Sequence, residues 1–576
     1  MASYITIQIY YLPKRLVSKF VFTDGYIVNN YVDHLLIVSA IVIWIVLSLR
    51  SNLRFAIAII YGGVYLAGLV MGIAILVEIT VVTSIPLVAS LSIYDKLSSR
   101  KILNEHPNLY VSYFSIMVIA FGITGIIISL AIPLLTAPTI SAHIPNYAYA
   151  IFAILGSTLS PIFMILIINA APIKVLAIEC IKRISILKRK VNTSLSIPHE
   201  ETSARNKIVF LTLIVLLALS LVLVPHLSTF NKSNRLIGAD SADYAYWESL
   251  LIKSSSPQDF LRKVFVIFEN GDRPVTLIFL FAITKVIPSE PKSIIDLVPA
   301  ILGPALVIAI YFLTHELTSN DRISLFASFL TAISFHMLVG IYAGFYANWF
   351  ALIIGYIAFV FLFRFLKTLK KINLVAYFFL ITLVLFSHTY TWTILTMVTS
   401  VFLLAILGLT HYSKKGVFFL LIVILASVAI DVVKITITKS AGGIEQDISV
   451  ASRQQVGVGQ LPVRWNNLID TTEIYYAGAF SNVIILTLGL YWLFQSDIRN
   501  PVNIFLVIFM SIGILPLFFG NWLVQSRVFY NIPFQIPAAI GLFYVGREKN
   551  GIMILISVCI WLIAMAVRTV SFLGTS

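Results

Sequence analysis

Apolar runs long enough to cross a membrane recur along almost the whole of this 576-residue chain, and they limit the folds open to it. A helix of about 20 apolar residues crosses the ~30 Å hydrocarbon core of a bilayer. The runs lack the alternation of outer-membrane strands, so we expect helices. A mean hydropathy of +0.97 excludes an ordinary soluble protein. The predicted fold is all-α and polytopic, with about 15 or 16 transmembrane helices.

The net charge of +15 comes from short basic loops between these runs and not from a nucleic-acid-binding patch. Cytoplasmic loops of membrane proteins are rich in Lys and Arg, so we place these loops in the cytoplasm and expect membrane lipids as partners, with no nucleic acid. The basic loops are 50–54, 95–101, 174–207, 321–322, 367–371, 414–415, 497–500 and 546–549.

The remaining loops are aromatic, polar or acidic and alternate with the basic ones, which predicts a multi-pass protein of the cell membrane. The two longest, 225–296 and 434–478, are expected to be extracytoplasmic. Within the first, 275–286 is too short for an ordinary span and is predicted to be interfacial or re-entrant. The predicted organisation is an N-terminal module of about five helices (1–170), a basic cytoplasmic linker (171–207) and a second membrane module (208–576).

The first long outer loop begins with acids and aromatic residues just beyond an apolar helix expected over 208–224. Apolar residues recur at helical spacing after Asp240, which predicts an amphipathic helix on the membrane surface. Two interpretations of the acids stay open. Asp240 and Asp243 fit the ends of a helix-capping pair. Alternatively, Asp240 is a general base whose pKa is tuned by burial.

Three later residues also have two interpretations each. Arg273, in Gly-Asp-Arg-Pro, marks either a turn before a helix or a phosphate ligand at the membrane surface. His388 is either a hydrogen-bonded histidine at a helix end or a functional one. Arg527 is a cation on the outer side, where the positive-inside pattern disfavours it, and this favours an anionic partner.

In residues 206–576 the order of these features resembles the GT-C superfamily of membrane glycosyltransferases. That superfamily includes protein O-mannosyltransferases, the aminoarabinose transferase of lipid A and the catalytic subunit of oligosaccharyltransferase. The shared order is an outer loop with an early acid and an aromatic residue four positions on (Asp240, Tyr244), an Arg-Pro pair (Arg273), an interfacial helix, and a late outer-side arginine (Arg527). The adjacent Asp-Glu pair of the mannosyltransferases is absent, and so is the Trp-Trp-Asp motif of the oligosaccharyltransferase subunit.

The resemblance implies a GT-C-like architecture and transfer of a sugar, with inversion, from a polyprenyl-phosphate carrier to a glycan, lipid or protein acceptor at the outer face. Asp240 would then be the base, and Arg527 and Arg273 would bind the leaving phosphate, with Tyr244 and His388 also at the substrate. Asp243 would position the acceptor or bind a divalent metal, although a single Asp-x-x-Asp does not define a metal site.

Two other classes of function remain as alternatives. A secondary transporter or lipid flippase predicts ionisable residues near the middle of the membrane and broken helices in two halves. The few charges within spans lie near helix ends, which favours chemistry at the surface. A non-catalytic scaffold with the same fold would be expected to lack the acid at position 240, which this chain retains.

Overall fold

The computed structural model describes residues 201–287, 289–408, 412–438, 501–513, 527–547 and 551–575, with shorter pieces within 118–131 and 488–500. The predicted N-terminal module, most of the linker and the loop after residue 438 lie outside these residues. The chain divides into two units, Met1–Val175 with Val545–Arg568, and Leu176–Tyr544 with Thr569–Ser576. The sequence features singled out from residue 208 to Arg527 lie in the second unit.

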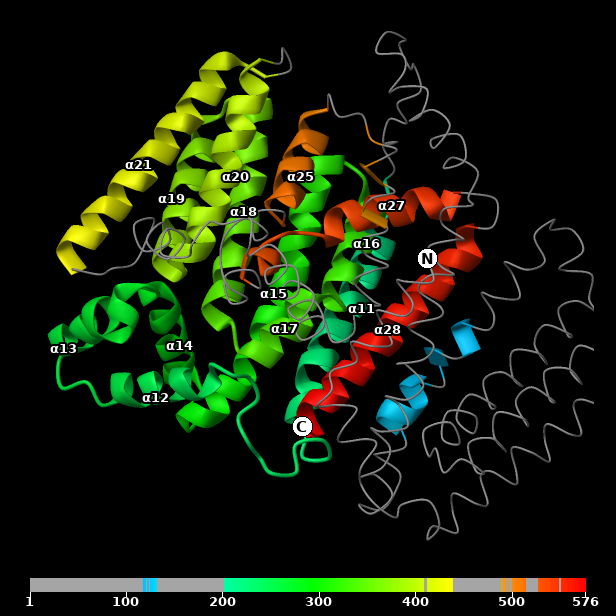
Figure 1. The fold of residues 1–576 in the computed structure, drawn as a ribbon, viewed down its shortest axis with the longest axis horizontal. Helices are drawn as coiled ribbons and strands as arrows, with labels where there is room; N and C mark the ends of the chain where they lie inside the picture. Colours follow the sequence, from blue (N-terminus) through cyan, green and yellow to red (C-terminus); the bar gives the residue numbers. More distant parts are fainter. Residues whose placement is uncertain are drawn as a thin grey trace, which may run out of the picture. The chain divides into compact units, whose positions relative to one another are not determined.

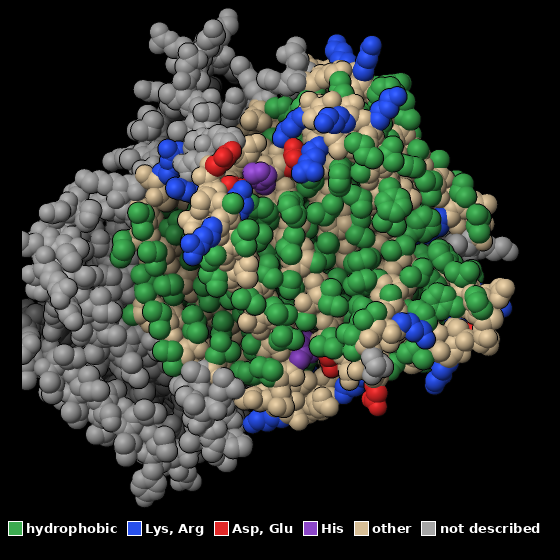
Figure 2. Space-filling view, turned by 180° about the vertical axis from the view of Figure 1, so that it is seen from behind, with side chains coloured by type: hydrophobic (Ala, Val, Ile, Leu, Met, Phe, Trp, Pro, Cys, Tyr) green, Lys and Arg blue, Asp and Glu red, His purple; other side chains and the backbone are tan. Residues whose placement is uncertain are grey.

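The described residues form helices and no strands, as predicted. Seven helical segments within the described ranges are long and apolar enough to cross a membrane, so the protein is a multi-pass membrane protein. The predicted total of about 15 or 16 spans includes segments outside the described residues and stays a prediction. Figure 2 shows one face of the molecule, on which apolar side chains form a broad band and most Lys and Arg lie above and below it.

The second unit is a bundle of long helices with a group of short helices at one end (Figure 1). The bundle consists of α11 (Ala204–Leu223), α15 (Pro291–Thr318), α16 (Asp321–Ala332), α17 (Phe335–Ala343), α18 (Tyr346–Thr368), α19 (Lys371–Ser387), α20 (Thr389–Leu407), α21 (Lys414–Thr438) and α25 (Pro501–Ser511). The short helices are α12 (Ser241–Ile252), α13 (Pro257–Arg262) and α14 (Pro274–Val286). Helix α14 has 13 residues, which span about 20 Å, so it is too short to cross the bilayer.

The core of the bundle is aromatic where α18, α20 and α25 meet. The rings of Phe359 and Phe363 on α18 lie 5.1 Å and 5.0 Å from that of Phe505 on α25, in edge-to-face geometry. Phe402 on α20 lies 5.3 Å from the same ring. Lipid tails are as apolar as these side chains, so close packing of this kind, and not exclusion from water, holds membrane helices together.

Where the structure describes them, the two predicted classes of loop lie at opposite ends of the bundle. At one end, Lys207 pairs with Asp321 at 2.9 Å, and Lys367 pairs with Glu316 at 2.9 Å. At the other end, the acidic segment before α12 contacts the end of α17, and α14 contacts the end of α19. Which end faces the outside stays a prediction.

Three boundaries differ from those expected. Helix α11 begins at Ala204, four residues inside the predicted linker, because Ser203 caps it by accepting from the Asn206 N–H. Helix α15 begins at Pro291, inside the predicted outer loop 225–296. Helix α21 continues to Thr438, so the first residues of the predicted loop 434–478 are helical, and Lys434 is a helix residue.

Candidate functional site

The site is organised around the connection between α17 and α18, residues 343–347, which we call the α17–α18 turn. Two backbone hydrogen bonds join the turn and the preceding Tyr342 to the acidic segment: Ala239 N donates to Tyr342 O at 3.1 Å, and Asp240 N donates to Ala343 O at 3.0 Å. Residues separated by about a hundred positions in the chain are thus fixed side by side. The main chain of Asp240 is therefore placed by the bundle and not by its own loop.

Two glycines allow this close approach. Gly344, at the end of α17, has φ +68°, a left-handed conformation that other residues adopt only at a cost. A Cβ at Gly344 would lie 3.0 Å from Ser241 Oγ and 3.2 Å from Asp240 N. Gly238 has φ +109°, and its Cβ would lie 2.5 Å from Ser241 Oγ. Side chains at either position would separate the acidic segment from the α17–α18 turn.

Asp240 occupies the N-cap position of α12, as the sequence predicted, but its side chain makes no capping hydrogen bond. The capping interpretation of the carboxylate is therefore wrong for this structure. Asp240 is half-buried, and it lies close enough to Tyr244 and Tyr346 to act on both electrostatically. Asp243, one turn into α12, is exposed.

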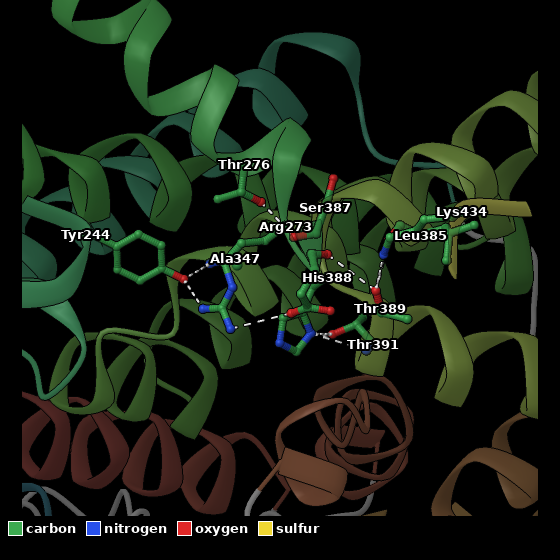
Figure 3. Close-up of polar contacts among 11 residues, drawn as sticks. Tyr244, Arg273, Thr276, Ala347, Leu385, Ser387, His388, Thr389, Thr391 and Lys434 are labelled. Atoms are coloured by element: carbon green, nitrogen blue, oxygen red, sulfur yellow. Dashed lines mark hydrogen bonds and ion pairs between the residues drawn. The ribbon is translucent and has the colours of Figure 1, made fainter. Parts of the chain in front are cut away.

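Tyr244 links α12 to both α14 and α18 (Figure 3). Its hydroxyl accepts from Arg273 Nη1 at 2.9 Å and from the buried Ala347 N–H at 3.2 Å. Ala347 lies in the first turn of α18, where backbone N–H groups have no partner within the helix, so Tyr244 acts as a remote cap. Burial raises the pKa of Tyr244, although Arg273 opposes the shift, and the phenol stays protonated at neutral pH.

Arg273 immediately precedes α14 and lies over two rings of α12. Its guanidinium carbon is 5.9 Å from the centre of the Tyr244 ring and 5.7 Å from that of Trp247. Its Nη2 is 3.5 Å from the carboxylate of Asp272. Cation–π contact and the Tyr244 hydroxyl together hold the guanidinium in one orientation, as a phosphate ligand requires.

The carboxylate of Asp272 balances the charges of the nearby cations Arg273 and Lys434. Burial raises its pKa, but the charge of Arg273 and that of Lys434 outweigh burial and lower the pKa to about 2. Lys434 Nζ donates to Thr389 Oγ1 at 2.7 Å, and Thr389 Oγ1 lies 3.3 Å from the carbonyl oxygen of Asp272 (Figure 3). Asp272 is thus ionised at neutral pH and serves as a counter-charge.

His388, between α19 and α20, is 4% exposed and oriented by Thr391. Its Nδ1 accepts from the Thr391 N–H at 3.2 Å, so a neutral ring carries its proton on Nε2. Thr391 Oγ1 in turn donates to Asn348 Oδ1 at 3.0 Å. Burial and the nearby cations Arg273 and Arg527 lower the pKa of His388 to about 3, although Asp272 acts in the opposite direction. Nε2 is therefore a neutral donor.

Arg527 lies beside Phe345 of the α17–α18 turn. Its guanidinium carbon is 6.0 Å from the centre of the Phe345 ring, and its charge reaches His388. No carboxylate within the described parts of the chain pairs with it, and its side chain is half-buried. A cation held in this way fits an anionic ligand.

The predicted residues Asp240, Tyr244, Arg273, His388 and Arg527 are thus all connected to the α17–α18 turn or to one another. The sequence interpretation placed Lys434 in the loop 434–478 and gave no role to Tyr346 or Asn348. One signal for Lys434 was available: the apolar pattern continues through Ile435 and Ile437, so the helix extends beyond Lys434.

The described residues do not fit a divalent metal. No three His, Cys, Asp or Glu side chains among them lie close enough to share one ion. The half-buried Asp240 lies near the phenols of Tyr244 and Tyr346, and Asp243 is exposed.

By sequence, the chain matches no known protein family and no curated protein. Among solved structures, it is similar to the crystal structure of the Archaeoglobus fulgidus oligosaccharyltransferase in the apo form, with 14% identity and a TM-score of 0.44 over 65% of this chain and 56% of that one. The complex of that enzyme with Zn and sulfate is similar at 15% identity and a TM-score of 0.42, over 64% of this chain and 53% of that one. This chain therefore spans just over half the length of either structure.

Proposed function

We propose that the protein is a GT-C-type glycosyltransferase that moves a sugar from a polyprenyl-phosphate-linked donor to an acceptor at the extracytoplasmic membrane face. One observation carries the proposal. The backbone of the half-buried acid Asp240 is hydrogen-bonded to Ala343, and the half-buried cation Arg527 lies over the ring of Phe345, in the same turn at one end of a membrane-spanning bundle. One short segment thus contacts both a candidate base and a candidate anion-binding group.

The charges of these side chains indicate the role of each in the reaction. The carboxylate of Asp240 takes the proton from the acceptor hydroxyl, whose oxygen forms a bond to the anomeric carbon of the sugar. The bond from that carbon to the phosphate oxygen breaks, and its electron pair leaves with the phosphate. Arg527, Arg273 and the Nε2–H of His388 stabilise the charge on that oxygen. Attack on the side opposite the leaving group inverts the anomeric centre.

The two arginines and the apolar faces of the helices would together hold the lipid carrier. Its phosphate would lie with Arg273 and Arg527 at the membrane surface, and its polyprenyl chain would lie along the apolar outer faces of the helices. Exposed apolar side chains such as Val375 and Phe379 on α19 and Leu425 on α21 provide such faces. The acceptor, a glycan, lipid or protein, would approach from the aqueous side.

The test is transfer of labelled sugar from a panel of polyprenyl-phosphate donors by the purified protein in lipid nanodiscs. We expect transfer by the wild type and a loss of about 10²- to 10⁴-fold for Asp240→Asn, the contribution typical of a general base. Arg364→Gln, at the opposite end of the bundle beside Glu316, is the control and should transfer at the wild-type rate. Absence of transfer by the wild type across the panel would contradict the proposal.

One observation favours the transporter alternative. The span Asp321–Ala343 is broken into α16 and α17, and the break is followed by His336, a fully buried ionisable residue. Broken helices with ionisable residues are typical of transporters. The test is uptake of labelled lipid or solute into proteoliposomes. Uptake by the wild type that is lost in His336→Phe, without any sugar transfer, would favour this alternative over the enzyme.

A further inference from the structure

Helix α12 contains a second acid, Glu248, that the proposed reaction does not use. Its side chain is 0% exposed and faces α14, where Thr284 Oγ1 lies 3.1 Å from Glu248 Oε1. The same hydroxyl lies 2.7 Å from Phe281 O, so its single proton is shared between two acceptors. Glu248 Oε2 is buried and has no hydrogen bond to any residue that the structure describes. An ionised carboxylate therefore has too few hydrogen-bond donors at this site.

A protonated carboxyl fits this environment better than an ionised one. Burial raises the pKa of Glu248 to about 7, although the Thr284 hydroxyl and the charge of Lys285 act in the opposite direction. Lys285, on α14, is the charged side chain that faces this carboxyl, and α12 itself supplies no other. A neutral carboxyl needs far less solvation than a buried anion does.

The position of Glu248 on α12 connects it to the candidate site. Tyr244 and Glu248 are four residues apart, on one face of the helix, and that face contacts α14. Tyr244 accepts from Arg273 at the start of α14, and Glu248 Oε1 is in hydrogen-bond contact with Thr284 Oγ1 near its end. Helix α12 is therefore fixed to α14 at two places, and Asp240 stands at the start of the same helix.

We propose that Glu248 is a positioning residue whose protonated carboxyl seats α12 against α14, so that loss of its proton loosens α12 and displaces Asp240 and Tyr244. Only the consequence for catalysis rests on the proposed function. The seating of α12 depends on the contacts alone. The two parts can therefore be tested separately.

Hydrogen–deuterium exchange of the peptide 241–252 tests the seating, with rates corrected for the intrinsic effect of pH. In the wild type we expect protection of α12 to fall several-fold as the pH rises through about 7. In Glu248→Gln, which cannot ionise, protection should not change over this range. Glu290→Gln removes an exposed acid that makes no capping bond and should behave as the wild type. A Glu248→Gln profile that follows the wild type would overturn the proposal.

A second variant keeps the test decisive if Glu248→Gln does not fold. Lys285→Met removes an exposed charge that favours the ionised carboxyl, so the loss of protection should move to higher pH. An unchanged midpoint would also refute the proposal. Sugar transfer, measured on the same samples, should fall above about pH 7 in the wild type but not in Glu248→Gln. Absence of transfer in every sample would refute the proposed function and leave the exchange result standing.

Discussion

Replacement of Tyr244 by Phe tests how the candidate site is held together. The variant keeps the ring, which is 1% exposed and lies 5.2 Å from the ring of Trp247, and removes only the hydroxyl. The buried Ala347 N–H then has no acceptor, which costs about 1 to 3 kcal/mol. Arg273 also loses its hydrogen bond to this hydroxyl but keeps its contact with Asp272, and the lost bond costs about 1 kcal/mol more. We expect a destabilisation of about 2 to 4 kcal/mol in total.

Thermal unfolding in nanodiscs measures this effect, and a loss of this size lowers the midpoint by about 3 to 5 °C for a unit of several hundred residues. Tyr246→Phe is the matched control, since Tyr246 lies on the same helix and is 61% exposed. Its midpoint should stay within about 1 °C of the wild type. Equal midpoints for the two variants would refute the assignment of Tyr244 as the cap of α18 and the anchor of Arg273.

Three further predictions concern the same end of the bundle. Gly344→Ala adds a Cβ to a left-handed residue beside Ser241 and should lower the free energy of unfolding by about 1 to 2 kcal/mol. Gly408→Ala adds a Cβ with nothing within 4 Å and should leave the stability unchanged. Unfolding midpoints measure both effects. Asp272→Asn should destabilise the protein at neutral pH by about 1 to 2 kcal/mol. Because the folded-state pKa of Asp272 is lowered to about 2, this difference should disappear as the pH falls from about 4 to about 2, and a constant difference would contradict the ionised counter-charge. Arg527→Gln should raise the KM for the donor about tenfold or more, with a smaller effect on kcat; an unchanged KM would remove Arg527 from the phosphate site.

The features that the sequence predicted well are local ones. Apolar periodicity and flanking polar residues placed α12 and α14 within a residue of their observed starts, because helix starts depend on neighbours in the chain. The association of Tyr244 with the Arg-Pro pair followed from the family resemblance. The structure adds the physical reason, a hydrogen bond between Tyr244 and Arg273.

The features that the sequence did not predict depend on contacts between distant segments. Asp240 precedes a helix and has the ideal side chain for a cap, but its backbone is fixed by Ala343, and its carboxylate does not cap. Tyr346 is of a type common at membrane interfaces and Asn348 is an ordinary polar residue, and only the tertiary fold places Tyr346 beside Ser241 and Asn348 beside Thr391. Lys434 was mistaken for a loop residue because a buried lysine is rare in a span.

The central claim is that Asp240 and Arg527 serve one substrate in different roles, and donor binding measured separately from sugar transfer tests it most directly. Binding of a labelled polyprenyl-phosphate sugar would be titrated for the wild type, Asp240→Asn and Arg527→Gln in identical nanodiscs, and single-turnover transfer would be followed in the same samples. We predict that Asp240→Asn binds the donor as tightly as the wild type and fails to transfer, whereas Arg527→Gln binds at least tenfold more weakly. Wild-type transfer by a folded Asp240→Asn, or wild-type donor affinity in Arg527→Gln, would contradict the account.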